Sequence, residues 1–383
     1  MTDLTPTALE TQALIRRVAR DRVASRADEI DKSAEYPQDM FDLLRELGIF
    51  TLPFPAEYGG QDSLLAGCVA VEELGRVCYN TGYLLVVQWT PFGAIMAAGT
   101  AAQRQRFLPG LASGELRAAF SITEPQSGSD VAGIKTRAVQ ADDGYRLNGA
   151  KIWCTNAAVS DFIVLAAKTG EGDLRGQINF FIVPTDSTGL TIGPKEDKLG
   201  ARGVPSSPLF LEDVFLPAEN MLGPEGGGFK QVMQALALSR PIIAARAVGL
   251  AQGALDHSLR FMHERQAFNQ PLTEFQGLRW LLADMAMGVE AARGLTYKAA
   301  AMTDAGVRGK DLAQAAAIAK AFSSDTAMKV ATDAVQIFGA SGISNDFPIN
   351  RYFRDAKVVQ IVEGSNQIQR NIIAKNLIDG FEA

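Results

Sequence analysis

The chain has 383 residues, 47% of them hydrophobic and 21% charged, which is the composition of a globular protein of two or three domains at about 150 residues each. It contains only two histidines, His257 and His263, and three cysteines, Cys68, Cys78 and Cys154. The close Cys and His spacing of a structural zinc site is missing, and a histidine-based catalytic triad is hard to assemble from so few residues. We therefore expect no bound metal and assign both histidines a structural role.

The charge pattern excludes further classes of protein. A net charge of −6, from 37 basic and 43 acidic residues without a long basic run, makes nucleic acid an unexpected partner. The first thirty residues lack the apolar core of a signal peptide, and no stretch of about eighteen apolar residues occurs. We expect a cytoplasmic protein with no membrane span.

The N-terminal third predicts helices. Residues 5–31 are amphipathic, residues 37–47 form a second helical segment, and residues 64–77 and 84–98 are apolar helical stretches. A loop rich in proline and glycine near residues 53–60 separates the second segment from the third.

The middle of the chain predicts strands instead. The turn dipeptides Asp143-Gly144 and Asn148-Gly149 are spaced as in a meander and separate short strands at 136–141, 145–147 and 151–154. Further strands follow at 162–167, 178–183 and 209–215, where Ile, Val, Leu and Phe are bounded by Gly, Pro and Asp. A β-domain is therefore expected near residues 117–220, with glycines 226–228 as a joint.

The last 160 or so residues predict long helices. Only Pro241, Pro271 and Pro348 follow Pro224, and apolar residues between 278 and 289 recur at helical spacing. An alanine-rich run from residue 311 to 338 has no breaker until Gly339. The fold class is therefore α+β, in the order helices, strands, helices.

The standard nucleotide-binding signatures are missing, but residues 120–130 form an unusual loop. No G-x-G-x-x-G motif follows a strand, and no P-loop occurs, which disfavours a Rossmann dinucleotide site and an ATPase. The loop, FSITEPQSGSD, combines small hydroxyl residues with a glycine and could present N–H groups and hydroxyls to an anionic or carbonyl-rich ligand. An ordinary Ser/Gly turn explains the same composition equally well.

Glu363 is the candidate general base. It follows two apolar residues and precedes a glycine, so its carboxylate could stand at a helix break with few polar neighbours. Desolvation would then raise its pKa toward the range that a general base needs. A solvated glutamate at a helix start is the alternative, and from the residues alone it is the commoner situation.

Two further residues have a structural and a functional interpretation. Trp153 could be a core residue, or it could lie against a flat ring system with Thr155 supplying a hydrogen bond. Arg265 could be a helix-surface charge, or it could hold a diphosphate in bidentate fashion.

Taken together, these segments resemble the acyl-CoA dehydrogenase family along nearly the whole chain and in the family's order. The matching segments include SITEPQSGSD at 121–130, EGSNQIQR at 363–370, and residues 47–60, 99–115, 147–156, 197–203, 265–268, 282–285 and 354–357. The resemblance implies an N-terminal helical domain (1–116), a central β-barrel-like domain (117–225) and a C-terminal four-helix bundle (226–383). It also implies a homotetramer in which a neighbouring subunit holds part of the FAD.

The resemblance also assigns roles to residues. It implies that the flavin is lined by Phe120, Ile122, Thr123 and Ser129, with Trp153 and Thr155 covering its ring. It implies that the diphosphate and adenosine are held across the subunit contact by Arg265, Phe268, Gln276, Gln336 and Gly339. FAD contacts after the base fall on Ser365 and Gln367, and acyl-CoA contacts on Ser129, Arg240 and Gly364.

The implied reaction is α,β-dehydrogenation of an acyl-CoA thioester. Glu363 removes the α-proton while the β-hydrogen leaves as hydride to the flavin, which gives a trans-2-enoyl-CoA. Hydrogen bonds to the thioester carbonyl stabilise the developing enolate. Electrons pass to an electron-transferring flavoprotein.

Alternatives remain at this stage. One branch of the family carries its base near Ser239 and Arg240, but Glu363 occupies the usual site and is favoured. Relatives of the same fold act as oxidases, desulfinases, monooxygenases or carrier-protein-bound acyl dehydrogenases, and a non-catalytic helical scaffold is a further possibility. Leu84 stands where glutaryl-specific relatives carry an arginine, which disfavours a dicarboxylic chain, and Trp89 would shorten the pocket only if it pointed inward.

Overall fold

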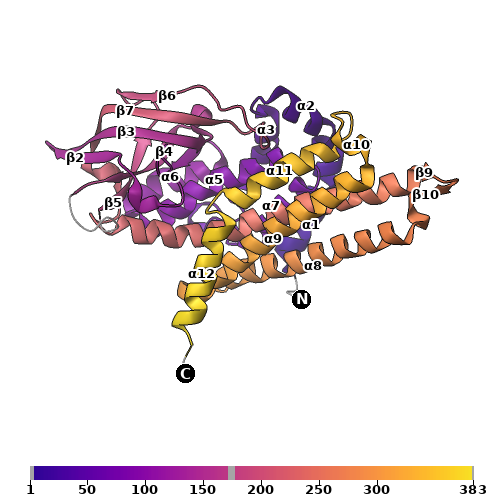
Figure 1. Ribbon diagram of the computed structural model, residues 1–383. Coiled ribbons are helices and arrows are strands. Elements are labelled where there is room, and N and C mark those ends of the chain that lie inside the picture. The colour runs from indigo at the N-terminus through magenta and orange to yellow at the C-terminus, as the bar shows by residue number, and fades with distance from the viewer. Residues whose placement is uncertain (1–3, 171–176, 382–383) are drawn as a thin grey trace.

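The computed structural model describes residues 4–170 and 177–381. Along the chain, a helical region comes first, a β-sheet region follows, and a second helical region ends the chain (Figure 1). The N-terminal helices are α1 (Pro6–Val18), α2 (Ala27–Ser33), α3 (Gln38–Glu46), α4 (Leu64–Gly75), α5 (Tyr79–Ala98) and α6 (Ala101–Ser113). The segment 5–31, predicted as amphipathic and helical, is helical in the structure, and a π-helical turn (Ala19–Val23) and a 3-10 turn (Ala24–Arg26) separate α1 from α2.

Helices α4 and α5 are the interior of the N-terminal region. Every residue of α4 is buried, and so is nearly all of α5, which explains why both segments read as continuous apolar runs in the sequence. The two acidic residues of α4 are paired: Glu72 accepts hydrogen bonds from Arg293 and Tyr297 at 2.8 Å each, and Glu73 binds Arg16 at 2.6 Å. The bonds to Glu72 join α4 to a C-terminal helix.

The central region is a mixed sheet. Its strands are β1 (Ala118–Ser121), β2 (Arg137–Ala141), β3 (Gly144–Thr155), β4 (Phe162–Lys168), β5 (Ile178–Pro184), β6 (Leu190–Ile192), β7 (Ser206–Pro217) and β8 (Met221–Leu222). They follow the order β6-β7-β3-β2-β4-β5-β8, and β1 pairs in parallel with β4. The alternate burial of β7 indicates one face toward the interior and one toward solvent.

One predicted turn was wrong and the other is confirmed. Asn148 and Gly149 lie inside the continuous strand β3, where the register with β7 shifts between Leu147 and Gly149. Gly149 has a φ of 150°, and a Cβ there would lie 2.6 Å from Thr136 Oγ1, so the dipeptide forms a bulge against a close neighbour. The turn before Gly144 does form, since that residue pairs with the end of β2.

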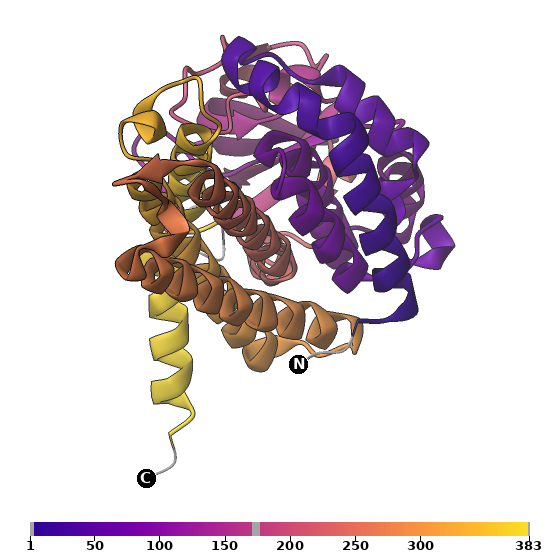
Figure 2. The ribbon, with the colours of Figure 1, turned by 90° about the vertical axis from the view of Figure 1, so that its right-hand side faces the viewer.

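The C-terminal region consists of long helices, as predicted. They are α7 (Gly228–Glu264), α8 (Gln276–Asp304), α9 (Gly309–Phe338), α10 (Ala340–Ile343), α11 (Ile349–Ile361) and α12 (Asn366–Asp379), with a small hairpin of β9 (Gln266–Ala267) and β10 (Gln270–Pro271) between α7 and α8. Figure 2 shows the N-terminal and C-terminal helices side by side, and α12 extends away from the rest.

The two helical regions share one hydrophobic core. A single cluster of buried side chains includes residues of α1 to α6, of α7, α8, α9 and α11, and of one face of the sheet, whereas a second cluster fills the inside of the sheet. This arrangement confirms the predicted α+β class with helical regions at both ends; the precise domain boundaries stay a prediction. Within the described ranges 4–170 and 177–381, no helix has the length and apolarity to cross a bilayer.

Candidate active site

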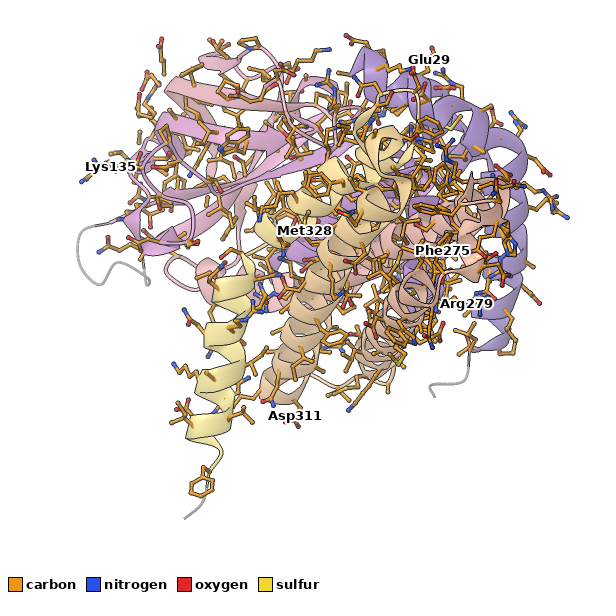
Figure 3. The ribbon with its side chains drawn as sticks, turned by 45° about the vertical axis from the view of Figure 1, so that its right-hand side comes forward. Glu29, Lys135, Phe275, Arg279, Asp311 and Met328 are labelled. Carbon is orange, nitrogen blue, oxygen red and sulfur yellow. The ribbon has the colours of Figure 1, made fainter. Side chains whose placement is uncertain are left out.

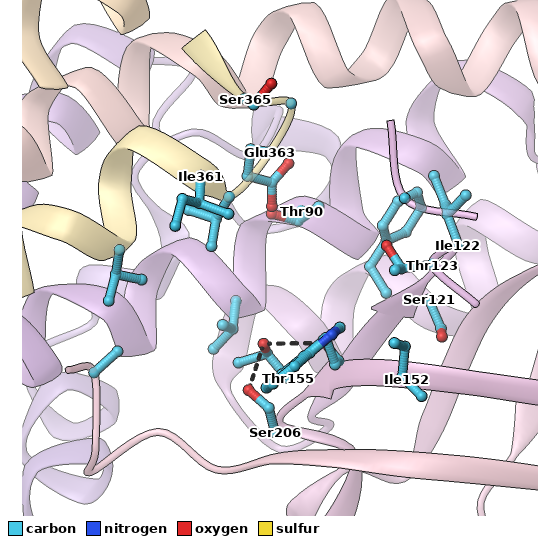
Figure 4. Close-up of a pocket in the computed structure, with 18 of the residues that line it drawn as sticks. Thr90, Ser121, Ile122, Thr123, Ile152, Thr155, Ser206, Ile361, Glu363 and Ser365 are labelled. Carbon is cyan, nitrogen blue, oxygen red and sulfur yellow. Dashed lines mark hydrogen bonds between the residues drawn. The ribbon is translucent and has the colours of Figure 1, made fainter. Parts of the chain in front are cut away.

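A cavity of about 700 Å³ lies where the sheet, α5, α7 and the loop between α11 and α12 meet (Figure 4). Ten of the predicted site residues line it: Phe120, Ile122, Thr123, Ser129, Trp153, Thr155, Arg240, Glu363, Gly364 and Ser365. They come from segments more than 240 positions apart in the chain, so the fold brings them together. Its size is within the usual range of ligand pockets, roughly 300–1,000 Å³.

Glu363 stands at a break between two helices, as predicted. Helix α11 ends at Ile361 and α12 begins at Asn366. Glu363 and Gly364 have φ values of 56° and 86°, so both adopt the left-handed conformation that turns the chain sharply. Figure 4 shows the Glu363 carboxylate pointing toward Thr90 of α5, which also lines the cavity.

The surroundings of Glu363 tune its acidity. Burial raises the pKa of its carboxyl group above the ordinary value, while the positive charges of Arg246, Arg240 and Lys320 and a hydrogen bond from Ser239 oppose that rise. The Ser239 hydroxyl lies 3.5 Å from Oε2. A desolvated carboxylate with nearby cations is an effective base that still ionises at moderate pH.

The opposite wall of the cavity comes from the sheet. Trp153 has a φ of 59°, lies within the register shift between Lys151 and Cys154 where β3 pairs with β7, and leaves 52% of its surface exposed. Thr155 Oγ1 lies 3.0 Å from the hydroxyl of Ser206 on β7. An exposed indole beside hydroxyl groups forms a flat, partly polar surface. Trp153 is therefore not a core residue.

A buried ion pair supports the loop that carries Thr123 and Ser129. Lys151 Nζ lies 2.8 Å from Glu124 Oε1 and 2.9 Å from the carbonyl oxygen of Ile122, and both charged side chains are almost fully buried. Glu124 also accepts hydrogen bonds from the N–H and hydroxyl of Thr136, at 2.9 and 2.6 Å. These bonds tie the cavity-lining loop to β3.

A buried arginine, Arg246, lies behind the cavity wall. The guanidinium carbon of Arg246 is 3.7 Å from the ring centroid of Tyr83 and 4.6 Å from that of Tyr79. Arg246 is fully buried, and none of its three guanidinium nitrogens has a hydrogen-bond partner among the residues that the structure describes. Tyr83 itself lines the cavity, so this cation packs directly against an aromatic wall residue.

The remaining predicted residues do not line the cavity. Five of them are exposed at one end of the C-terminal helices, namely Arg265, Phe268, Gln276, Gln336 and Gly339. The stacked rings of Phe261 on α7 and Phe338 on α9, 4.1 Å apart, place the ends of these helices together. Figure 3 labels Phe275 and Arg279 beside the hairpin at this end. Gln367 is exposed in the first turn of α12.

Family models match the chain in three consecutive parts. The N-terminal domain of acyl-CoA dehydrogenases matches residues 5–115, the middle domain residues 119–214, and the C-terminal domain residues 226–378. The chain belongs to the acyl-CoA dehydrogenase family. The resemblance drawn from the sequence motifs is thereby confirmed.

Individual members of the acyl-CoA dehydrogenase family are similar to this chain over almost its full length. It is 42% identical to the cyclohexane-1-carbonyl-CoA dehydrogenase of Geobacter metallireducens over 95% of each chain. It is 38% identical to the solved butyryl-CoA dehydrogenase of Megasphaera elsdenii, with a TM-score of 0.95 over 99% of this chain and 100% of the other. A chain in the structure of the electron transferring flavoprotein of Acidaminococcus fermentans matches equally well, at 38% identity and a TM-score of 0.95 over 99% of each chain.

The sequence analysis did not predict several residues that line the cavity. Tyr83, Thr90, Lys198 and Ser206 line the cavity, but no site role was predicted for them. Thr90 is a lone hydroxyl within an apolar helical run, which is a usable signal, whereas nothing local marks Ser206. Within the described ranges, no cluster of three or more His, Cys, Asp or Glu residues could hold a metal ion.

Trp89, considered for pocket length, and Leu84, considered for dicarboxylic chains, both lie outside the cavity lining. Trp89 is buried between helices and donates a hydrogen bond from Nε1 to the carbonyl oxygen of Phe50 at 2.9 Å. Leu84 is fully buried in the hydrophobic core. Trp89 therefore does not shorten the pocket.

Proposed function

We propose that this chain is an FAD-dependent acyl-CoA dehydrogenase that converts an acyl-CoA thioester to a trans-2-enoyl-CoA. The observation that carries the proposal is the Glu363 carboxylate in a cavity that also contains the exposed face of Trp153. One group can remove a proton and the other can lie against a flat ring. Family membership supports the same reaction class.

The residues of the cavity suit a flavin. Trp153 leaves its indole surface open toward the cavity, and the hydroxyls of Thr155 and Thr123 can bond to the polar edge of an isoalloxazine ring. When bound, the flavin would accept the hydride from the β-carbon. We assign the contacts with the ring system to the cavity residues Phe120, Ile122, Thr123, Ser129, Trp153, Thr155 and Ser365.

Glu363 is assigned the proton transfer. Its carboxylate takes the α-proton, and burial keeps its pKa raised so that the proton is held after transfer. The backbone N–H of Glu363 has no acceptor in the part of the chain that the structure describes, and we assign it to the thioester oxygen as enolate charge develops. Arg240 and Gly364 are assigned to the acyl-CoA.

The exposed residues at the other end of the C-terminal helices are assigned to a subunit contact. Arg265, Phe268, Gln276, Gln336 and Gly339 form an exposed set away from the cavity, which suits residues that hold the distal half of an FAD bound by a neighbouring subunit of a homotetramer. Gln367 is assigned to FAD on the same grounds. We propose an electron-transferring flavoprotein as electron acceptor, since a chain of similar sequence and fold belongs to such a structure.

An anaerobic titration of the FAD-loaded protein with a panel of acyl-CoAs tests the function. The panel should include short, medium, branched and alicyclic chains, because the named relatives act on butyryl-CoA and cyclohexane-1-carbonyl-CoA. We expect the flavin absorbance to bleach with at least one of them and to return slowly in air. Rapid turnover with oxygen would indicate an oxidase, and no bleaching with any thioester would contradict the proposal.

A further inference from the structure

Lys320 is a buried cation directly below the loop that carries Glu363. It lies in the middle of α9 and is fully buried. Its Nζ donates hydrogen bonds to the carbonyl oxygen of Gly364 at 3.0 Å, to Asn366 Oδ1 at 2.9 Å and to the carbonyl oxygen of Gln360 at 3.4 Å. Three acceptors match the three N–H groups of an ammonium ion, so the geometry calls for the charged form, whereas burial lowers the pKa of the Lys320 ammonium to about 7 and the charge of Glu363 raises it.

The loop between α11 and α12, which carries Glu363, needs the hydrogen bonds that Lys320 supplies. Glu363 and Gly364 both have positive φ values, and for a residue with a side chain this conformation persists only when its surroundings hold it. Gln369 Nε2 donates to the carbonyl oxygen of Gly364 at 2.9 Å and lies 3.4 Å from that of Glu363. The carbonyl oxygen of Gly364 is therefore held from two sides, by α9 and by α12.

The acceptor Asn366 is itself fixed by neighbours. Ser324 donates to Asn366 Oδ1 at 3.0 Å, and the Asn366 amide donates to Asp325 at 2.6 Å. Asp325 also accepts from Gln360 at 2.7 Å and from Arg370 at 2.6 Å. This network is buried at Lys320, Ser324 and Asn366 and reaches the surface at Asp325 and Arg370. It extends from α9 to the end of α11 and the start of α12, which are the two sides of the loop.

We propose that Lys320 is the positioning residue of the catalytic loop: its ammonium ion joins Gln360, Gly364 and Asn366 and thereby holds the Glu363 carboxylate in the cavity. The proposal rests on the assignment of Glu363 as the base. Lys320 does not line the cavity and acts through the loop. Its charge also favours the carboxylate form of Glu363, together with Arg240 and Arg246 from α7 and against the effect of burial.

The test is Lys320→Met, which keeps an unbranched apolar side chain one atom shorter than that of lysine and removes the N–H groups and the charge. We expect flavin reduction by the best acyl-CoA to slow by about 10- to 100-fold, since small displacements of reacting groups have effects of this size. Hydrogen–deuterium exchange of residues 361–366 should become faster. The acid limb of the pH profile of flavin reduction should move to higher pH, an effect that a purely structural role would not produce.

Two further variants make the outcome decisive. Lys310→Met removes an exposed lysine from the same helix and should change neither exchange nor rate. Lys320→Gln keeps N–H donors but not the charge, so it should shift the acid limb as Lys320→Met does, even if the latter folds poorly. Wild-type exchange and an unshifted acid limb in both Lys320 variants would overturn the proposal. A wild-type protein that no acyl-CoA bleaches would instead overturn the proposed function.

Discussion

The Nζ atom of Lys151 lies 2.8 Å from Oε1 of Glu124, and both side chains are buried beneath the loop that lines the active-site cavity. Removal of one member of such a pair leaves an uncompensated buried charge. We therefore expect Lys151→Met to lower the free energy of unfolding by about 3–5 kcal/mol, as measured by urea denaturation at pH 7. Lys135→Met, at an exposed side chain nearby, should leave it nearly unchanged.

The same pair predicts the acid sensitivity of the protein. Burial opposes ionisation of Glu124, but the charge and hydrogen bond of Lys151, with further bonds from Thr136 and Lys135, lower its pKa from 4.5 to about 2. A lowered pKa in the folded state gives stability that is present above pH 4.5 and is lost as the pH falls toward 2. Denaturation curves of the wild type should show this loss, and those of Glu124→Gln should show less of it.

Arg246 should influence the base from behind the cavity wall. Its charge lowers the pKa of Glu363 against the effect of burial. In Arg246→Met the pKa of Glu363 should therefore rise, and the acid limb of acyl-CoA-driven flavin reduction should move to higher pH. Stopped-flow reduction across pH 5–9 measures the shift; an acid limb that stays in place would show that the Arg246 charge is screened from Glu363.

Trp89 should matter for stability rather than for substrate choice. Trp89→Phe leaves the buried carbonyl oxygen of Phe50 without its donor, which should cost about 1–3 kcal/mol in the free energy of unfolding. The order of preference among acyl-CoAs should stay the same, because Trp89 does not line the cavity. Trp280→Phe, at a tryptophan that is 64% exposed, is the matched control. A changed chain-length preference in Trp89→Phe would contradict this assignment.

Phe268 tests the proposed subunit contact. It is 91% exposed in the chain, which is unusual for a phenylalanine unless another molecule covers it. We expect Phe268→Asp to shift the protein toward smaller species in sedimentation and to lower its FAD content after dialysis. Leu9→Asp, at another exposed apolar residue on α1, should change neither. Unchanged assembly and FAD content in Phe268→Asp would place the contact elsewhere.

The sequence predicted the order of helices and strands because periodicity and proline placement are local signals. It failed at Asn148-Gly149, where a favoured turn dipeptide forms a bulge in a long strand paired with β7. That outcome depends on pairing with residues about 60 positions away, which no local pattern reveals. No local pattern marks the turns after α1 either, since residues 19–26 keep a helical sequence pattern while adopting π and 3-10 turns.

The candidate site was predicted mainly from family motifs rather than from physical patterns. From the residues alone, Glu363 was more probable as an exposed glutamate; only the fold shows that it is desolvated beside Arg240, Arg246 and Lys320. Lys320 carries no motif that marks a role, because its three acceptors come from the ends of two other helices.

Glu363→Gln provides the most direct test of the central claim, because the amide has nearly the same shape but cannot take a proton. The variant should bind FAD and remain yellow, and anaerobic addition of the acyl-CoA that bleaches the wild type fastest should leave its absorbance unchanged. Bleaching of Glu363→Gln at the wild-type rate would contradict the assignment of Glu363 as the base.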